Sequence, residues 1–345
     1  MTDLATIHQL SDDSMWLLST DRAELHPFTD HFAVDGGYAI LSHTWGPNEQ
    51  TFQDLQALRA ECERTGKNPR DCAQEKIRMS CVLAEKHGYQ WVWIDTCCID
   101  KTSSSELSEA INSMFNWYAS AEVCYAYLED VPPNCKIKAR DSAFRKARWH
   151  TRGWTLQELI APHVVIFLSS DWQPLGTKLE LASLLSKITG IRTHVLMHKY
   201  RFDLVTVAQR MSWASKRQTT RVEDEAYCLM GLFNINMPTI YGEGREAFQR
   251  LQQEIMKTTF DTSIFVWGAR VSTDPNSWSP EQTTYHTIPD DDTCPLARSP
   301  YDFTPDDGLV FYSPDTHSVQ PYLAWQWKVC LVHMYAWRSV VLTPA

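Results

Sequence analysis

The sequence predicts an α/β fold with a parallel sheet and flanking helices, and three observations support this. Four apolar runs, rich in β-branched and aromatic residues, have the length of strands and span residues 38–42, 91–95, 123–128 and 164–168. The runs are continuous rather than alternating, which is typical of strands covered on both faces. Helical patterns separate them, and this order implies right-handed crossovers between parallel strands.

The helical patterns between these runs have recognisable ends. Apolar residues recur at helical spacing over residues 77–84, and Gly88 follows as a glycine that can end the helix. Ser103 and Glu106 have the spacing of a capping box ahead of an apolar face that includes Ile111. A further crossover helix is predicted to begin near Trp154, just before the fourth strand.

The remaining sequence suggests a division into four segments. Residues 1–37 precede the first predicted strand and form an N-terminal arm, and residues 38–172 form the α/β domain. Residues 173–268 carry amphipathic helical runs, which we expect to form a C-terminal helical extension packed on the sheet. Pro, Asp, Ser and Thr dominate after that, so residues 269–345 are predicted to be an irregular tail.

Composition excludes several classes of protein. The formal charge of −10 argues against nucleic acid as a partner, since phosphate binding needs clustered Lys and Arg. No window reaches the roughly 18 apolar residues of a membrane span, and the start lacks a signal sequence. The ten cysteines show neither disulfide spacing nor paired metal knuckles. We therefore expect a cytoplasmic protein without a structural metal.

Candidate site residues follow two of the predicted strands. Open parallel sheets bind ligands at the carboxyl ends of their strands. His43 and Trp45 come after the first strand, and Asp95 ends the second. Glu158 falls in the second turn of the helix that begins near Trp154, which places it close to the same edge.

The environment of Glu158 has two interpretations at this point. An unpaired buried carboxylate is costly or takes up a proton. Glu158 is therefore either paired with a cation such as Arg152, as a structural ion pair, or it awaits a ligand. Asp95 also has two interpretations, because it could bind a ribose or cap the following loop.

Several long motifs in fixed order resemble the fungal heterokaryon incompatibility (HET) domain. They are YAILSHTWG at 38–46, WVWIDTCCID at 91–100 and RGWTLQELIAP at 152–162. The resemblance covers roughly residues 38–267. It implies a role in self/non-self recognition and programmed cell death after fusion of unlike fungal cells. Self-association and other incompatibility proteins are the partners that it implies.

HET domains are in turn distantly similar to TIR domains, which are flavodoxin-like folds of which some cleave NAD. In those enzymes the catalytic glutamate lies four residues after a tryptophan and just before a leucine. Trp154, Glu158 and Leu159 match that spacing. The resemblance thus implies a flavodoxin/TIR-like sheet and an NAD(P) nucleosidase with Glu158 as its catalytic residue. NAD or NADP would be a substrate, and no cofactor is expected.

The chemistry of such a reaction needs few groups. Nicotinamide leaves as a neutral molecule, so the barrier is the oxocarbenium-like ribosyl centre, which a fixed carboxylate stabilises. Trp154 or Trp45 could stack on the nicotinamide ring, with His43, Asp95 and Arg152 as further substrate-binding residues. The alternative is a non-enzymatic module that signals death by oligomerising. A third hypothesis is a module that binds a nucleotide without cleaving it.

Overall fold

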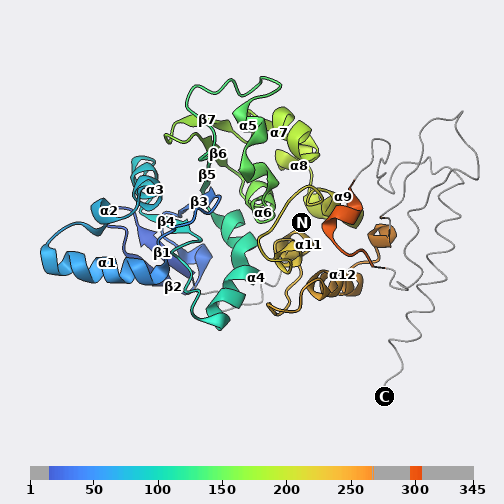
Figure 1. Cartoon of the computed structure of the whole chain (residues 1–345), viewed down its shortest axis with the longest axis horizontal. Helices are drawn as coiled ribbons and strands as arrows, with labels where there is room; N and C mark the ends of the chain where they lie inside the picture. The colour runs from blue at the N-terminus through green and yellow to red at the C-terminus, as the bar shows by residue number, and fades with distance from the viewer. Residues whose placement is uncertain (1–14, 266, 268–295, 305–345) are drawn as a thin grey trace, which may run out of the picture.

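A computed structural model describes residues 15–265, 267 and 296–304 of the chain. Its centre is a seven-stranded sheet with the order β2-β1-β4-β3-β5-β6-β7 (Figure 1). The strands are β1 Met15–Ser19, β2 Leu25–Phe28, β3 Ala39–His43, β4 Trp91–Ile94, β5 Val123–Tyr127, β6 Val165–Leu168 and β7 Pro174–Thr177. The predicted α/β class is confirmed.

The four predicted strands are the four parallel strands at the centre of the sheet. They are β3, β4, β5 and β6, and their order in space is β4-β3-β5-β6. Numbered along the chain, this order is second, first, third, fourth, which is the order of flavodoxin-like folds. In such a sheet the point where the strand order reverses lies between the first and third strands, here β3 and β5.

Three further strands lie outside the predicted set. β1 and β2 form an antiparallel hairpin in the segment expected to be an arm, and Leu18 pairs with Val92 of β4. Leu17 and Leu18 are fully buried, so this short apolar stretch joins the core rather than extending from it. β7 pairs antiparallel with β6 in the segment expected to be helical. Residues 1–14 of the expected arm lie outside the described part of the chain.

Twelve α-helices are described, and α1–α6 fall among the strands and crossovers. They are α1 Phe52–Thr65, α2 Pro69–Cys72, α3 Glu75–Lys86, α4 Ser104–Ser120, α5 Ala143–Lys146 and α6 Thr155–Ile160. The capping box predicted for α4 is half formed. The Ser103 hydroxyl accepts from the Glu106 amide, but the Glu106 carboxylate accepts from the amide of Asp100 instead. Gly88 follows α3 with φ +90°, the left-handed conformation expected of a terminating glycine.

The expected helical extension packs against the α/β unit. Its helices are α7 Ala182–Thr189, α8 Thr193–Leu196, α9 Val207–Ser212, α10 Asp224–Tyr227, α11 Met230–Phe233 and α12 Glu246–Thr258. In Figure 1, α1–α3 lie on the left and α9, α11 and α12 on the right, with α4 between them. Gly231 of α11 allows a close approach to α4, because a Cβ there would lie 2.1 Å from the Cβ of Phe115.

Short 3₁₀ helices complete the described chain. They are η1 His31–Ala33, η2 Arg148–Thr151, η3 Phe202–Leu204, η4 Thr262–Phe265 and η5 Pro300–Phe303. The segment 296–304 packs through η5 on α9, with Phe303 buried. The rest of the expected irregular tail, residues 269–295 and 305–345, lies outside the described residues.

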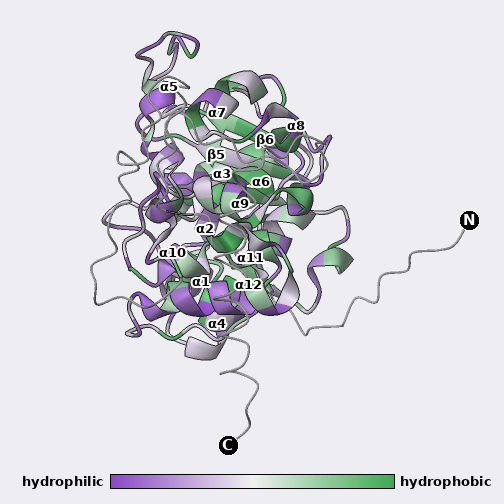
Figure 2. Ribbon diagram, turned by 90° about the vertical axis from the view of Figure 1, so that its right-hand side faces the viewer, coloured by the Kyte–Doolittle hydropathy of each residue, from purple (hydrophilic) through white to green (hydrophobic). Residues whose placement is uncertain are grey.

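One hydrophobic core spans the sheet and the helical extension. Trp93 of β4 is fully buried and meets Trp117 and Tyr118 of α4 edge-on, with ring centroids 5.5 and 5.8 Å apart. β6, which is mostly buried, has hydrophobic colouring in Figure 2. No helix in the part of the chain that the structure describes is both long and apolar enough to cross a membrane.

Candidate site at the carboxyl edge of the sheet

The carboxyl ends of β3 and β4 bring His43, Trp45 and Asp95 together. The indole Nε1 of Trp45 donates to Asp95 Oδ2 at 2.7 Å. The Nδ1 atom of His43 lies 3.8 Å from Asp95 Oδ1, which is within ion-pair range but too far for a hydrogen bond. Three of the residues predicted for the site thus form one cluster, because neighbouring parallel strands end at the same edge of the sheet.

His43 lies between two carboxylates. Its side chain is fully buried, and its Nε2 atom lies 3.8 Å from Glu49 Oε2, on the side opposite Asp95. Glu49 also accepts from Lys76 Nζ at 2.5 Å and from the Gly46 amide at 2.6 Å. Burial raises the pKa of Glu49, but its interactions with His43 and Lys76 outweigh burial and lower the pKa to about 2. Glu49 is therefore a permanent negative charge at this edge.

The charged cluster continues to the end of β5, where the strand order reverses. Arg148 Nη2 lies 3.4 Å from Glu129 Oε2 and donates to the Thr44 hydroxyl at 3.2 Å. Lys76 Nζ lies 4.0 Å from the same Glu129 carboxylate. Sequence reasoning missed Lys76 and Arg148, because each comes from a helical segment distant in sequence from the strand end that it contacts.

Trp45 is half exposed, but one face of its ring is occupied. Lys101 Nζ lies 3.8 Å from the centroid of the Trp45 ring, and Trp45 is 49% exposed. This is a cation–π contact. Stacking of a cationic nicotinamide on this face would require Lys101 to move away.

Glu158 lies beneath this edge, in α6, and is sealed from solvent. It is 4% exposed and accepts a hydrogen bond from the Ser42 hydroxyl, which in turn accepts from Trp149 Nε1 at 2.6 Å. Burial, and after it the charge of Asp95, raises the pKa of Glu158 to about 8, although the hydrogen bond from Ser42 and the charge of Arg217 act in the opposite direction. Glu158 is therefore mainly a neutral acid at pH 7.

Arg152 does not pair with Glu158, so the structural ion pair is wrong. Arg152 has extended backbone angles, forms a bridge with Gln218 and donates from Nη2 to the Thr220 hydroxyl at 3.1 Å. Extended backbone before the helix carries the Arg152 side chain away from the helical face of Glu158. Trp154 interacts with Asp224 of α10 instead of with the cluster around His43.

A buried arginine near Glu158 comes instead from the helical extension. Arg217 interacts electrostatically with Glu158, and its Nη1 atom donates to Arg152 O and to Thr155 Oγ1, both at 2.8 Å. Burial lowers the pKa of Arg217 to about 10. Nothing in the sequence spacing indicates this contact, because 59 residues separate Arg217 from Glu158.

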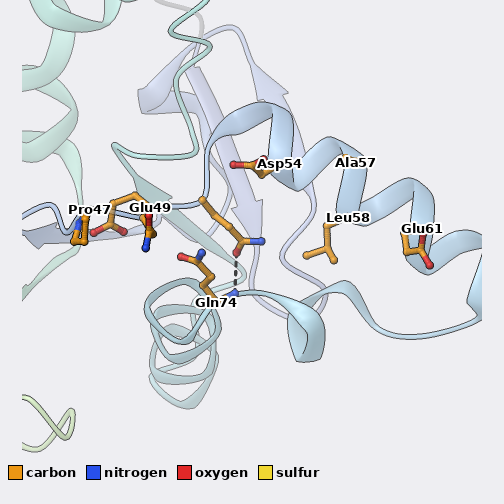
Figure 3. A pocket seen from close by; sticks show the side chains of 9 residues that line it. Pro47, Glu49, Asp54, Ala57, Leu58, Glu61 and Gln74 are labelled. Atoms are coloured by element: carbon orange, nitrogen blue, oxygen red, sulfur yellow. Dashed lines mark hydrogen bonds between the residues drawn. The ribbon is translucent and has the colours of Figure 1, made fainter.

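An open groove of about 680 Å³ lies beside the cluster around His43. Figure 3 shows Asp54, Ala57, Leu58 and Glu61 of α1 on one side, with Pro47, Glu49 and Gln74 on the other. Three of these lining residues are carboxylates, so the groove repels a nucleotide diphosphate. Glu158 lines neither this groove nor a second cavity of about 260 Å³.

The comparisons with known proteins agree with the resemblance seen in the motifs. Residues 38–143 match the family model "Heterokaryon incompatibility protein (HET)", and residues 246–320 match a "Domain of unknown function (DUF8212)". Residues 38–143 of the chain are therefore similar to the HET domain. Glu158 and α6 follow the segment that the HET model matches.

One curated relative extends the match beyond the HET segment. It is the vegetative incompatibility protein HET-E-1 of Podospora anserina, which is 45% identical over 227 residues. The alignment covers 64% of this chain but 16% of the relative, so the chain spans about a sixth of that protein. No solved structure gives a significant match.

Proposed function

We propose that this chain acts in vegetative incompatibility, as the part of an effector that causes cell death when unlike cells fuse. The observation that carries this proposal is the 45% identity over 227 residues to a protein named for vegetative incompatibility. Because the match spans 16% of that relative, the proposal concerns this part of an effector alone. Self-association and contact with other incompatibility proteins belong to the same proposal.

We further propose that the activity is hydrolysis of the nicotinamide–ribose bond of NAD or NADP, with Glu158 as the catalytic residue. The flavodoxin-like strand order supports a ligand site at this edge of the sheet. Glu158 lies close enough to Asp95, at that edge, for their charges to interact. Arg148 and Lys101 supply positive charge there for the phosphates of a dinucleotide.

The reaction follows from the charges of the substrate. The C1′–N bond breaks, and both electrons pass to the ring nitrogen, so that nicotinamide leaves as a neutral molecule. Water forms the new bond to C1′ and releases one proton to the carboxylate or to solvent. Ionised Glu158 stabilises the positive charge that develops at C1′.

The described state of Glu158 is a resting state in this proposal. The carboxyl group is buried and mainly neutral at pH 7, whereas stabilising a cation requires its ionised form. A cationic nicotinamide ring placed beside Glu158 lowers its pKa and favours that form. Catalysis therefore requires an opening that admits the substrate between α6 and the strand ends. Self-association is the event that we propose to cause it.

The decisive experiment measures nicotinamide released from NAD and from NADP by the concentrated, purified chain. The wild-type chain is expected to release nicotinamide. Glu158→Gln is expected to abolish release while its circular dichroism spectrum is unchanged. Glu63→Gln, on the exposed face of α1, is the matched control and should retain full activity. Release by Glu158→Gln at the wild-type rate would contradict the catalytic role.

The burial of Glu158 also favours a second candidate, a module that signals without catalysis. A preformed active site would have Glu158 in the lining of a cavity, but Glu158 lines neither of these two cavities. Both edge strands of the sheet, β2 and β7, are four residues long and contain a proline, Pro27 and Pro174. Short edges with proline resist edge-to-edge pairing, so such a module would assemble through its helices.

Overexpression separates the two candidates. An enzyme predicts that Glu158→Gln abolishes cell death, and a non-enzymatic module predicts that this variant still kills. In the second case, substitutions on exposed helix faces that block assembly should abolish killing instead.

A further inference from the structure

A second cavity, of about 260 Å³, lies on the side of α6 where the helical extension packs. It is formed by Gly153, two residues before α6, by the loop that follows α9, by the region of α10 and by η5. Its lining residues are Gly153, Ala214, Ser215, Lys216, Arg217, Gln218, Thr219, Glu225, Cys228, Ser299, Pro300 and Tyr301. η5 lies in residues 246–320, the segment that matches the domain of unknown function. One wall of the cavity is therefore formed by the contact of η5 with the rest of the chain.

Two charged side chains in this lining each keep one buried atom without a partner. Arg217 uses Nη1 for two hydrogen bonds, but Nη2 is buried and has no hydrogen-bond partner. Oε2 of Glu225 is likewise buried and unpaired. Among the described residues neither side chain forms an ion pair. Buried polar atoms of native proteins nearly always have partners, and leaving charged ones unpaired is costly.

The chemistry of the lining defines what would satisfy both atoms. Nη2 of Arg217 needs an acceptor, and a carboxylate gives the strongest pair because the exposed Lys216 beside it adds positive charge. Oε2 of Glu225 needs a donor. Cys228, Pro300 and the ring of Tyr301, which also line the cavity, offer apolar contact to an occupant. The volume is below the roughly 300–1,000 Å³ of sites for drug-sized ligands, so the occupant is small.

We propose that this cavity is a binding site for a small zwitterion of the free α-amino-acid class. The carboxylate of the ligand pairs with Arg217, its ammonium group pairs with Glu225, and its side chain lies against Tyr301 and Pro300. This proposal does not depend on NAD cleavage.

The position of Arg217 gives the site an effect on α6. Arg217 donates to the backbone carbonyl of Arg152, just before α6, and to the hydroxyl of Thr155, the first residue of α6. The Gly153 amide also donates to Gln218 O at 2.9 Å. A ligand held by Arg217 therefore restrains the start of the helix that carries Glu158. Ligand binding should slow amide hydrogen exchange over residues 153–160.

The test is calorimetric titration of the chain with each of the twenty free L-amino acids in a buffer without carboxylates. At least one should bind. Its N-acetyl form loses the ammonium group, and its amide form loses the carboxylate, so each should bind about tenfold or more weakly. Glu225→Gln should weaken binding similarly, whereas Glu246→Gln on the exposed face of α12 should leave it unchanged.

Tyr301→Ala provides a second variant, because Tyr301 is 70% exposed and its loss should not disturb folding. It should weaken binding of an amino acid with an apolar side chain. The proposal is overturned if no amino acid binds. It is also overturned if a bound amino acid retains its affinity for Tyr301→Ala and for a folded Glu225→Gln variant. If Glu225→Gln does not fold, the Tyr301→Ala result together with the N-acetyl and amide probes decides.

Discussion

Glu158 is a carboxyl group whose charge is set by its surroundings. It is buried, it accepts a hydrogen bond from Ser42, and Asp95 lies near enough to add negative charge. Its pKa of about 8 in the folded chain compares with an ordinary value of 4.5. The fold thus favours the protonated form. The raised pKa of Glu158 stabilises the folded chain fully below pH 4.5, and this stabilisation is lost as the pH rises through 8.

Replacement of Glu158 by Gln should therefore remove a pH dependence. Gln keeps the shape and cannot ionise, so Glu158→Gln should be more stable relative to wild type at pH 9 than at pH 5. We expect this gain to be on the order of a few kcal/mol in the free energy of unfolding, measured with urea at both pH values. Glu63→Gln should show no such gain. An equal difference between Glu158→Gln and wild type at the two pH values would mean that Glu158 is not neutral in the fold.

At the scale of elements, α6 is short and is held at both ends by cations from other segments. Arg217 binds its start, as described above. Lys178, at the end of β7, donates to Leu159 O at 3.1 Å and to Pro162 O. Its Nζ also contacts His198 Nε2 at 2.9 Å, and burial lowers the pKa of Lys178 to about 8. A six-residue helix has little stability alone, so these contacts fix the position of Glu158.

Lys178→Met should loosen α6 more than it destabilises the whole chain. Removal of the ammonium group frees the carbonyl groups at the end of the helix but also relieves a buried charge, so the global effect is small. Amide hydrogen exchange over residues 155–162 should become faster. Lys187→Met, at an exposed position of α7, is the matched control and should not change it. Unchanged exchange in Lys178→Met would show that α6 does not need this lysine.

The contact between α4 and α11 depends on the absence of a side chain at Gly231. A Cβ there would lie 2.1 Å from Cβ of Phe115, so Gly231→Ala should destabilise the chain by about 1–3 kcal/mol. Thermal unfolding measures this. In the double variant with Phe115→Ala, part of the loss should be recovered relative to the sum of the single effects. Full additivity would indicate that the two helices do not meet at this point.

At the scale of the whole molecule, the sequence predicted the central sheet but not its edges. The four parallel strands were recognisable because buried strands read as continuous apolar runs. The edge strands lack this signal. β1 and β2 form a short hairpin in which only β1 is an apolar run, and β7 contains Pro174 and Gly176, two residues that are unusual inside strands. The strand ends also predicted the cluster of His43, Trp45 and Asp95, since parallel strands end at one edge.

The surroundings of Glu158 were not predictable in the same way. Arg152 lies close in sequence, but its backbone is extended, and its partner Thr220 is 68 residues away. Arg217 and Lys178 reach α6 only because the helical extension and β7 fold back onto the α/β unit. Contacts of this kind depend on tertiary packing, which leaves no periodic signal in the sequence.

The catalytic role of Glu158 is tested most directly by the pH dependence of nicotinamide release from NAD at subsaturating substrate. If ionised Glu158 stabilises the transition state, kcat/KM should rise with pH and level off above about 8, the pKa of Glu158 in the free protein. Glu158→Gln should show no activity at any pH. A rate that is independent of pH between 6 and 9, or nicotinamide release by Glu158→Gln, would contradict the account.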